Sequence, residues 1–182
     1  MPSALSPFGR RPSASQIEQW RDWLDEAADR FEQPGFIQDD PLGIPHAFEN
    51  PNDQAIAGFL SATLAWGNRK SIMRSCEDLL DRMDRAPAEF IRRADAKDME
   101  RLTGFVHRTF QGEDAMRFIR CLRSLEADGG LQGAFSRAFR EAPDVASRPG
   151  LPDAGVALSL FKARFFRDVE AGRTGKHVAD PL

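Results

Sequence analysis

Apolar residues recur every three or four positions along most of this chain, which is the spacing of amphipathic helices. Two-residue alternation is absent and the chain contains no tyrosine, so strands are disfavoured. The pattern therefore predicts an all-α fold, a compact multi-helix domain. The helices are expected at about 15–33, 52–66, 71–83, 87–93, 97–110, 113–127, 131–141 and 152–170.

The same spacing selects the apolar residues that should form the core. Ser15 with Glu18 is expected to form a capping box at the start of the first helix, and Asn52 or Asp53 to cap the second. The last helix is apolar nearly all round, so it needs neighbours on several sides, and a protein partner is a candidate to cover it. The residues expected to be well buried are Trp20, Ile56, Phe59, Leu60, Leu79, Phe118, Leu122 and Phe161.

The chain has 182 residues, enough for one domain with a substantial core. Residues 1–14 are rich in proline and serine and are expected to form a disordered leader, followed by a single helical domain over residues 15–182. No run of 18 apolar residues occurs, so we expect no membrane partner. Cys76 and Cys121 lack metal or redox spacing and no signal peptide is evident, which favours reduced thiols in a cytoplasmic protein.

The segment from Ala55 to Lys70 carries the strongest chemical pattern. It begins as an apolar helix and ends in Trp66, Asn68, Arg69 and Lys70, which offer a stacking ring, an amide and two cations in one loop. Such a combination can bind a phosphate backbone or an unstacked base. Its alternative interpretation is a core helix with a C-cap and a solvated basic turn. The net charge of −3 confines any DNA contact to a local patch.

Two further basic pairs, His107 with Arg108 and Lys176 with His177, are candidate phosphate contacts. Their alternative role is to complement the dipole at a helix C-terminus. The chain offers no nucleophile elbow and no glycine loop that would cradle a phosphate.

Asp39, Asp40 and His46 are the best candidates for metal ligands in the sequence. Carboxylates and imidazole are metal ligands, but no pair among them has the helical i, i+4 spacing of a zinc motif. Asp40 also precedes a proline, which is typical of a turn. The sequence therefore predicts neither a metal nor a cofactor.

The stretch from Pro41 to Ile72, with Leu64-Ala65-Trp66-Gly67-Asn68-Arg69-Lys70 inside it, is similar to an uncharacterised bacterial domain-of-unknown-function family. The runs 105–110 and 176–178 fit the same family, and the resemblance covers about residues 17–182. That family in turn resembles helix-hairpin-helix DNA glycosylases of the endonuclease III type, in which a helix precedes a loop that approaches DNA. The resemblance implies part of that fold, and a DNA-binding role for Trp66, Asn68, Arg69, Lys70, His107, Arg108 and Lys176.

This resemblance also defines the expected activity and its rivals. In such glycosylases a flipped base is cleaved with the help of an aspartate. Thr63 stands where they carry a glutamine, and the aspartate of the similar family lies beyond its Lys-His-Val segment. The chain is thus expected to be the N-terminal, DNA-binding portion of a glycosylase-like protein of base excision repair, inactive alone. The alternatives are a non-catalytic helical protein-interaction module and a metal-dependent hydrolase using Asp39, Asp40 and His46.

Overall fold

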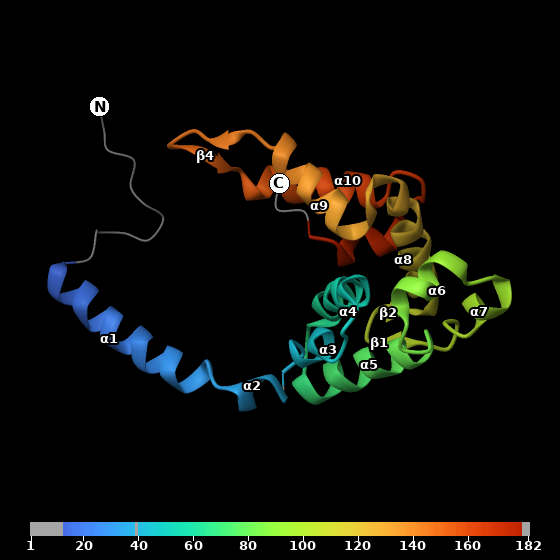
Figure 1. Cartoon of the computed structure of the whole chain (residues 1–182), viewed down its shortest axis with the longest axis horizontal. Helices are drawn as coiled ribbons and strands as arrows, with labels where there is room; N and C mark the ends of the chain where they lie inside the picture. Colours follow the sequence, from blue (N-terminus) through green and yellow to red (C-terminus); the bar gives the residue numbers. More distant parts are fainter. Residues whose placement is uncertain (1–12, 39, 180–182) are drawn as a thin grey trace. The chain divides into compact units, whose positions relative to one another are not determined.

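The computed structural model describes residues 13–38 and 40–179, which belong to two compact units, Met1–Asp39 and Asp40–Leu182 (Figure 1). Of the leader expected over residues 1–14, residues 1–12 lie outside the described residues. Ser13 and Ala14 already belong to the start of the first helix. The expectation of one domain over residues 15–182 stays a prediction.

The first unit contains α1 (Ala14–Phe31) and α2 (Pro34–Gln38). A capping box begins α1, but it lies two residues before the predicted one. The Gln16 N–H donates to Ser13 Oγ at 3.3 Å, and the Ser13 N–H donates to Gln16 Oε1 at 2.9 Å. Because glutamine can replace glutamate at the third position, the pair at Ser13 satisfies the same backbone donors.

The burial predicted for Trp20 is wrong, because its side chain is 53% exposed. No residue of α1 is buried within the described chain. Inside this unit α2 has only five residues, and the ring contact between Phe31 and Phe36 (5.9 Å) joins the two helices at one end. Helical periodicity predicted the helix correctly, whereas burial also requires a neighbouring element.

The second unit carries the remaining elements and the hydrophobic core. Short helices and turns connect longer helices, and two hairpins interrupt the series. The elements are α3 (Gly43–His46), α4 (Pro51–Leu64), α5 (Arg69–Asp81), α6 (Pro87–Arg93), α7 (Ala96–Glu100), β1 (Val106–His107), β2 (Phe110–Gln111), α8 (Gly112–Ser124), η1 (Leu125–Asp128), α9 (Gly130–Glu141), β3 (Asp144–Val145), β4 (Arg148–Pro152), α10 (Ala154–Phe165) and η2 (Gly172–His177).

The N-cap of helix α4 lies two or three residues before the predicted one. Asn50 is the N-cap, and its side-chain oxygen accepts the N–H of Asn52 at 2.9 Å. Asp53 lies in the first turn instead, where its carboxylate accepts the Ala88 N–H of α6 at 2.8 Å. The cap and the long-range contact together fix the start of α4 against α6.

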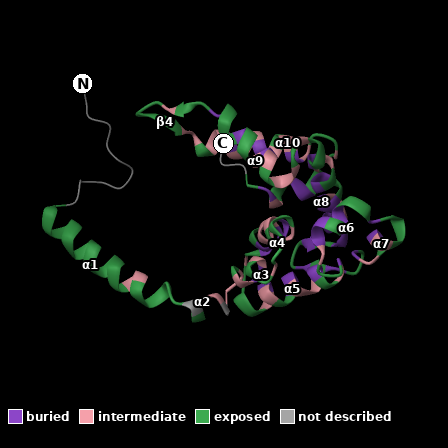
Figure 2. Ribbon diagram, viewed as in Figure 1, coloured by how far each residue is buried: buried purple, intermediate pink, exposed green. Residues whose placement is uncertain are grey.

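Phenylalanine rings join four helices at the centre of the second unit. Phe59 of α4 lies 5.9 Å from Phe118 of α8, 6.4 Å from Phe135 of α9, and 5.3 Å from Phe165 of α10. Ring pairs of this kind add attraction beyond the area that they bury. Buried residues accordingly gather where α8, α9 and α10 face their neighbours (Figure 2).

Most of the predicted core is confirmed. Phe59 is only half-buried, although it contacts several rings. The last helix, α10, packs against α9 and α8, which is how its apolar faces are covered within this unit. The expected partner for this helix stays a prediction. The buried members of the predicted set are Ile56, Leu60, Leu79, Phe118, Leu122 and Phe161.

The all-α prediction is confirmed, with two antiparallel hairpins as additions. The helix predicted over 97–110 ends at Glu100, and β1 and β2 follow, with His107 paired to Phe110. Arg108 adopts a φ of 53° in the turn between them, a conformation that no helix accommodates. In the described part of the chain, no helix combines the length and apolar character needed to cross a membrane.

Candidate nucleic-acid interface

Trp66 lies in a tight turn between α4 and α5. Helix α4 ends at Leu64, and the Trp66 N–H donates to the Leu64 carbonyl at 2.7 Å. Gly67 follows with a φ of 117°, which favours glycine. Asn68 then caps α5, its side-chain oxygen accepting the Ser71 N–H at 3.4 Å. The turn therefore fixes the half-buried indole between two helix ends.

Arg108 of the hairpin turn stacks on this indole. Its guanidinium carbon lies 5.6 Å from the Trp66 ring centroid, within the range of a cation–π contact. A Cβ atom on Gly67 would lie 2.3 Å from a guanidinium nitrogen of Arg108. Gly67 is thus required twice, for its backbone conformation and for the space that the guanidinium occupies.

His107 supports the indole from inside the protein. Its side chain is 2% exposed, and its Nδ1 lies 2.9 Å from Ser75 Oγ of α5. The rings of His107 and Trp66 meet edge to face at 5.4 Å. His107 Nε2 has no hydrogen-bond partner among the described residues. Burial therefore places His107 beneath Trp66, away from the protein surface.

The η2 segment brings a second histidine and a lysine to the same place. His177 stacks on Trp66 at 6.2 Å with an interplanar angle of 28°, and its ring also lies 5.0 Å from Phe110. Desolvation by burial lowers the pKa of His177, the Asp114 carboxylate opposes this, and the charge of Lys176 reinforces it. Because a lowered pKa favours the neutral imidazole at pH 7, His177 contributes a flat, uncharged ring.

These segments border an open pocket of about 330 Å³, lined by Thr63, Trp66, Thr109, Lys176 and His177. We call it the Trp66 pocket. A second pocket of about 220 Å³ shares Thr63 and His177 with it and is otherwise walled by apolar side chains. Through these shared residues the Trp66 pocket borders a second, apolar depression. Such a combination of apolar walls and a few polar groups is typical of small-ligand sites.

The predicted site residues separate into two groups. Trp66 and Lys176 line the Trp66 pocket, and Arg108 lies against the Trp66 ring. Asn68 instead caps α5, and Arg69 Nη2 lies 3.4 Å from Asp40 Oδ2. Lys70 is exposed in the first turn of α5, and His107 is buried beneath the indole.

Two lining residues, Thr63 and Thr109, are absent from the residues predicted to contact DNA, and His177 was predicted only as half of the basic pair with Lys176. Thr109 directly follows Arg108, and this adjacency is the one signal in the sequence that could have found it. Neither spacing nor composition indicates that the segments of Thr109 and His177 meet in space.

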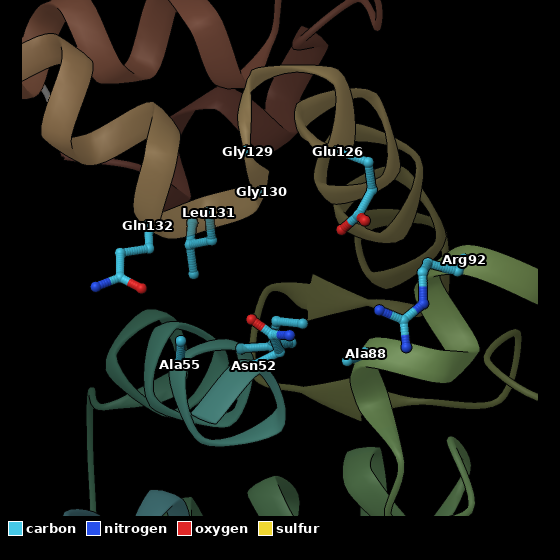
Figure 3. A pocket seen from close by; sticks show the side chains of 10 residues that line it. Asn52, Ala55, Ala88, Arg92, Glu126, Gly129, Gly130, Leu131 and Gln132 are labelled. Atoms are coloured by element: carbon cyan, nitrogen blue, oxygen red, sulfur yellow. The ribbon is translucent and has the colours of Figure 1, made fainter. Parts of the chain in front are cut away.

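A different pocket, of about 220 Å³, lies between α4, α6 and the start of α9. Figure 3 shows Arg92 and Glu126 extending into it from neighbouring elements, with Asn52 on the side of α4. All three of these polar side chains are exposed, and the two charges are opposite in sign. Its described lining contains no aromatic ring, in contrast to the Trp66 pocket.

The metal-site hypothesis gains no support from the described residues. They contain no group of three or more histidine, cysteine or acidic side chains that could hold a metal ion. Asp40 is paired with Arg69, its Oδ1 also accepts the Leu42 N–H at 3.0 Å, and His46 is exposed at the end of α3. Asp39 lies outside the described residues.

Comparison with known proteins identifies a family but no characterised relative. The model of the family described as a protein of unknown function (DUF2400) matches residues 40–182, which cover α3 to η2 and the whole Trp66 pocket. No curated protein and no solved structure matches the chain. The likeness to an uncharacterised domain family is thereby confirmed. Since the match spans most of its length, the chain belongs to the DUF2400 family.

Proposed function

We propose that the second unit is the DNA-binding portion of a DNA glycosylase-like protein of the base excision repair type. The observation that carries this proposal is that Trp66 and Lys176 line one pocket while Arg108 lies against the Trp66 ring. An indole offers a stacking surface for an unpaired base, and the two cations suit the phosphates that flank it. The resemblance of the sequence to helix-hairpin-helix glycosylases supports the same assignment.

The charge distribution supports a local contact. The whole chain carries a formal charge of −3, so nucleic acid gains no general attraction from it. Around the Trp66 pocket, however, Arg108 and Lys176 are exposed, and no lining residue among those described is acidic. Because exposed charges act over about 8–10 Å at physiological salt, these two cations determine the potential that a phosphate meets there.

The shape and chemistry of the pocket support binding of an extrahelical base. Its aromatic wall consists of Trp66 and His177, and the apolar depression beyond Thr63 can exclude water from a planar ring. The Thr63 hydroxyl donates to the Phe59 carbonyl at 2.9 Å, so its oxygen remains able to accept a hydrogen bond. Flipped bases are read by this combination of stacking and edge hydrogen bonds.

Base release is not expected from this chain alone. The described lining of the Trp66 pocket contains no carboxylate that could stabilise a cationic transition state. The nearby buried carboxylate of Asp114 already accepts hydrogen bonds from Arg173 and Thr174. We therefore propose binding without glycosylase activity.

Fluorescence anisotropy with a single-stranded oligonucleotide, and with a duplex containing one unpaired base, tests the proposal. Arg108→Ala and Lys176→Ala should each reduce the slope of log affinity against log salt by about 0.7–0.9, since one phosphate contact is lost. Trp66→Ala should lower affinity and leave the salt slope unchanged, because stacking releases no counterions. Arg93→Ala is the matched control, since Arg93 is an exposed arginine paired with Glu89 on α6.

Three results would contradict the proposal. Wild-type affinity in both Trp66→Ala and Arg108→Ala would remove the Trp66 pocket from any DNA surface. An equal loss of salt slope in Arg93→Ala would show that the cations act only through net charge. Release of a base by the purified chain, abolished by a substitution within it, would refute the absence of catalysis.

The protein-interaction module remains the alternative, and one observation favours it. Helix α1 exposes a row of apolar side chains, with Trp20 53% and Trp23 65% exposed. Exposed apolar patches of this kind mark contact surfaces for other molecules. Under this alternative, Trp20→Glu and Trp66→Ala weaken association with a protein partner, and neither changes oligonucleotide affinity or its salt slope. Under the proposed DNA-binding function, Trp66→Ala lowers oligonucleotide affinity and Trp20→Glu does not.

A further inference from the structure

Asp114 connects the start of α8 to the η2 segment. Its side chain is 1% exposed, and its hydrogen-bond partners Gln111, Arg173 and Thr174 lie at or beside these two places. Oδ2 accepts the Gln111 N–H at 2.9 Å and a guanidinium N–H of Arg173 at 2.8 Å. Oδ1 accepts the Thr174 hydroxyl at 2.6 Å. Both carboxylate oxygens are therefore satisfied, as a buried charge requires.

The residues that Asp114 joins lie close to the Trp66 pocket, one in β2 and the others in η2. Gln111 belongs to β2 with Phe110, whose ring contacts His177. Thr174 lies two residues before Lys176 in η2 and is itself 1% exposed. Because η2 is a 3₁₀ segment of six residues, its own hydrogen bonds fix its position poorly. Its placement depends on contacts with other elements.

We propose that Asp114 is a positioning residue, which fixes η2 so that Lys176 and His177 line the Trp66 pocket. This inference rests on the proposed function, since it assigns Asp114 an effect on nucleotide binding through Lys176. Asp114 touches no ligand in this scheme. Its carboxylate acts on the site through Arg173 and Thr174.

Charge gives the inference a distinctive consequence. Asp114→Asn makes the protein one unit less negative, which by general electrostatics should strengthen binding to DNA. The positioning role predicts the opposite, weaker binding with a salt slope reduced by about 0.7–0.9, because Lys176 no longer meets its phosphate. Thr174→Val removes one hydrogen bond without changing charge and should shift both quantities in the same direction.

A readout that needs no DNA tests the position of His177 directly. Protonated imidazole quenches indole fluorescence at short range, so Trp66 emission should fall as pH drops through the pKa of His177. His107 also contacts the indole, at 5.4 Å, so the quenching assigned to His177 is the part that His177→Gln removes. Trp20→Phe with Trp23→Phe removes the other indoles. In this background Asp114→Asn and Thr174→Val should abolish the pH-dependent quenching. Loss of the Asp114 charge should also lower the pKa of His177 further, measured by NMR of its ring protons, because that carboxylate favours the cation.

Asp53→Asn is the matched control. Asp53 is also a carboxylate that joins two elements, accepting the Ala88 N–H at 2.8 Å, but it lies outside the Trp66 pocket. It should lower the free energy of unfolding without affecting the quenching or the salt slope. Equal effects in Asp53→Asn and Asp114→Asn would overturn the inference, because general destabilisation would then explain both.

The outcomes separate this inference from the proposed function. If the wild-type protein binds no oligonucleotide, the proposed function fails, and the quenching experiment still decides whether Asp114 positions His177. If quenching persists unchanged in Asp114→Asn or in Thr174→Val, the inference fails whatever the protein binds. Should Asp114→Asn not fold, Thr174→Val provides the decisive measurement.

Discussion

Replacing Gly67 by alanine tests the geometry of the turn that presents Trp66. Gly67 has a φ of 117°, and a Cβ there would lie 2.3–2.6 Å from the guanidinium of Arg108. The backbone conformation alone should cost about 1–3 kcal/mol. The guanidinium can move aside because it is the end of a flexible chain, but it must then leave the indole. For a domain of this size, the cost corresponds to a fall in Tm of about 2–12 °C.

Thermal unfolding followed by circular dichroism measures the loss of stability, and oligonucleotide anisotropy measures the loss of Arg108 from the Trp66 pocket. Gly58→Ala is the matched control in α4, since its Cβ would meet Pro45 at an ordinary 3.6 Å. Alanine there should leave Tm unchanged or raise it, because glycine is unfavourable inside a helix. An unchanged Tm in Gly67→Ala would refute the reasoning, since the strained φ and the contact with Arg108 could not then both exist.

Three further substitution and pH experiments examine the core around the site. Gly112→Ala should destabilise the protein by about 1–3 kcal/mol in urea unfolding, because its Cβ would lie 2.3 Å from the Leu102 carbonyl oxygen. Phe118→Ala should cost about 3–5 kcal/mol, since that ring is fully buried among other rings; a value below 1 kcal/mol would contradict this packing. Burial raises the pKa of Cys76 to about 11 and of Cys121 to about 12. In the unfolded chain a thiol ionises at about pH 8.5. The two buried thiols therefore contribute fully to stability below that pH, and this contribution is lost as pH rises toward 11–12, because only the unfolded chain then gains from ionisation. The double variant Cys76→Ala, Cys121→Ala should lose less stability between pH 8 and pH 10 than the wild-type protein does.

Local patterns in the sequence predicted the helices well. Helix α6 begins at Pro87 and ends at Arg93, as expected, because proline is favoured at a first helical position. The errors occur where the same spacing of apolar residues fits both a helix and a turn. Leu102 and Phe105 have helical spacing, yet they are buried from turns that precede β1. Apolar spacing cannot distinguish a short helix from a turn that buries the same side chains.

The site was harder to predict than the fold. Trp66 and Arg108 were both selected, but only the structure shows that they stack, because 42 positions of chain, from 66 to 108, separate them. The sequence also grouped Asn68 and Arg69 with Trp66 because all three are adjacent. In the folded protein Asn68 caps α5, and Arg69 forms an ion pair with Asp40.

This division of roles changes which cations should contact DNA. A loop that had to bind phosphate with Asn68 and Arg69 would have to give up a helix cap, worth about 0.5–2 kcal/mol, and an ion pair. Arg108 carries no such conflict, since its guanidinium keeps donors available while its face rests on the indole. The β1–β2 hairpin and the η2 segment therefore supply the charges, and the turn after α4 supplies the ring. Arg69→Ala should accordingly lower the free energy of unfolding and leave the salt slope nearly unchanged. Arg108→Ala should reduce the salt slope and leave the free energy of unfolding nearly unchanged. If Arg69→Ala alone reduced the salt slope by about 0.7–0.9 at unchanged stability, the phosphate contact would belong to the α4–α5 loop, as the sequence first indicated.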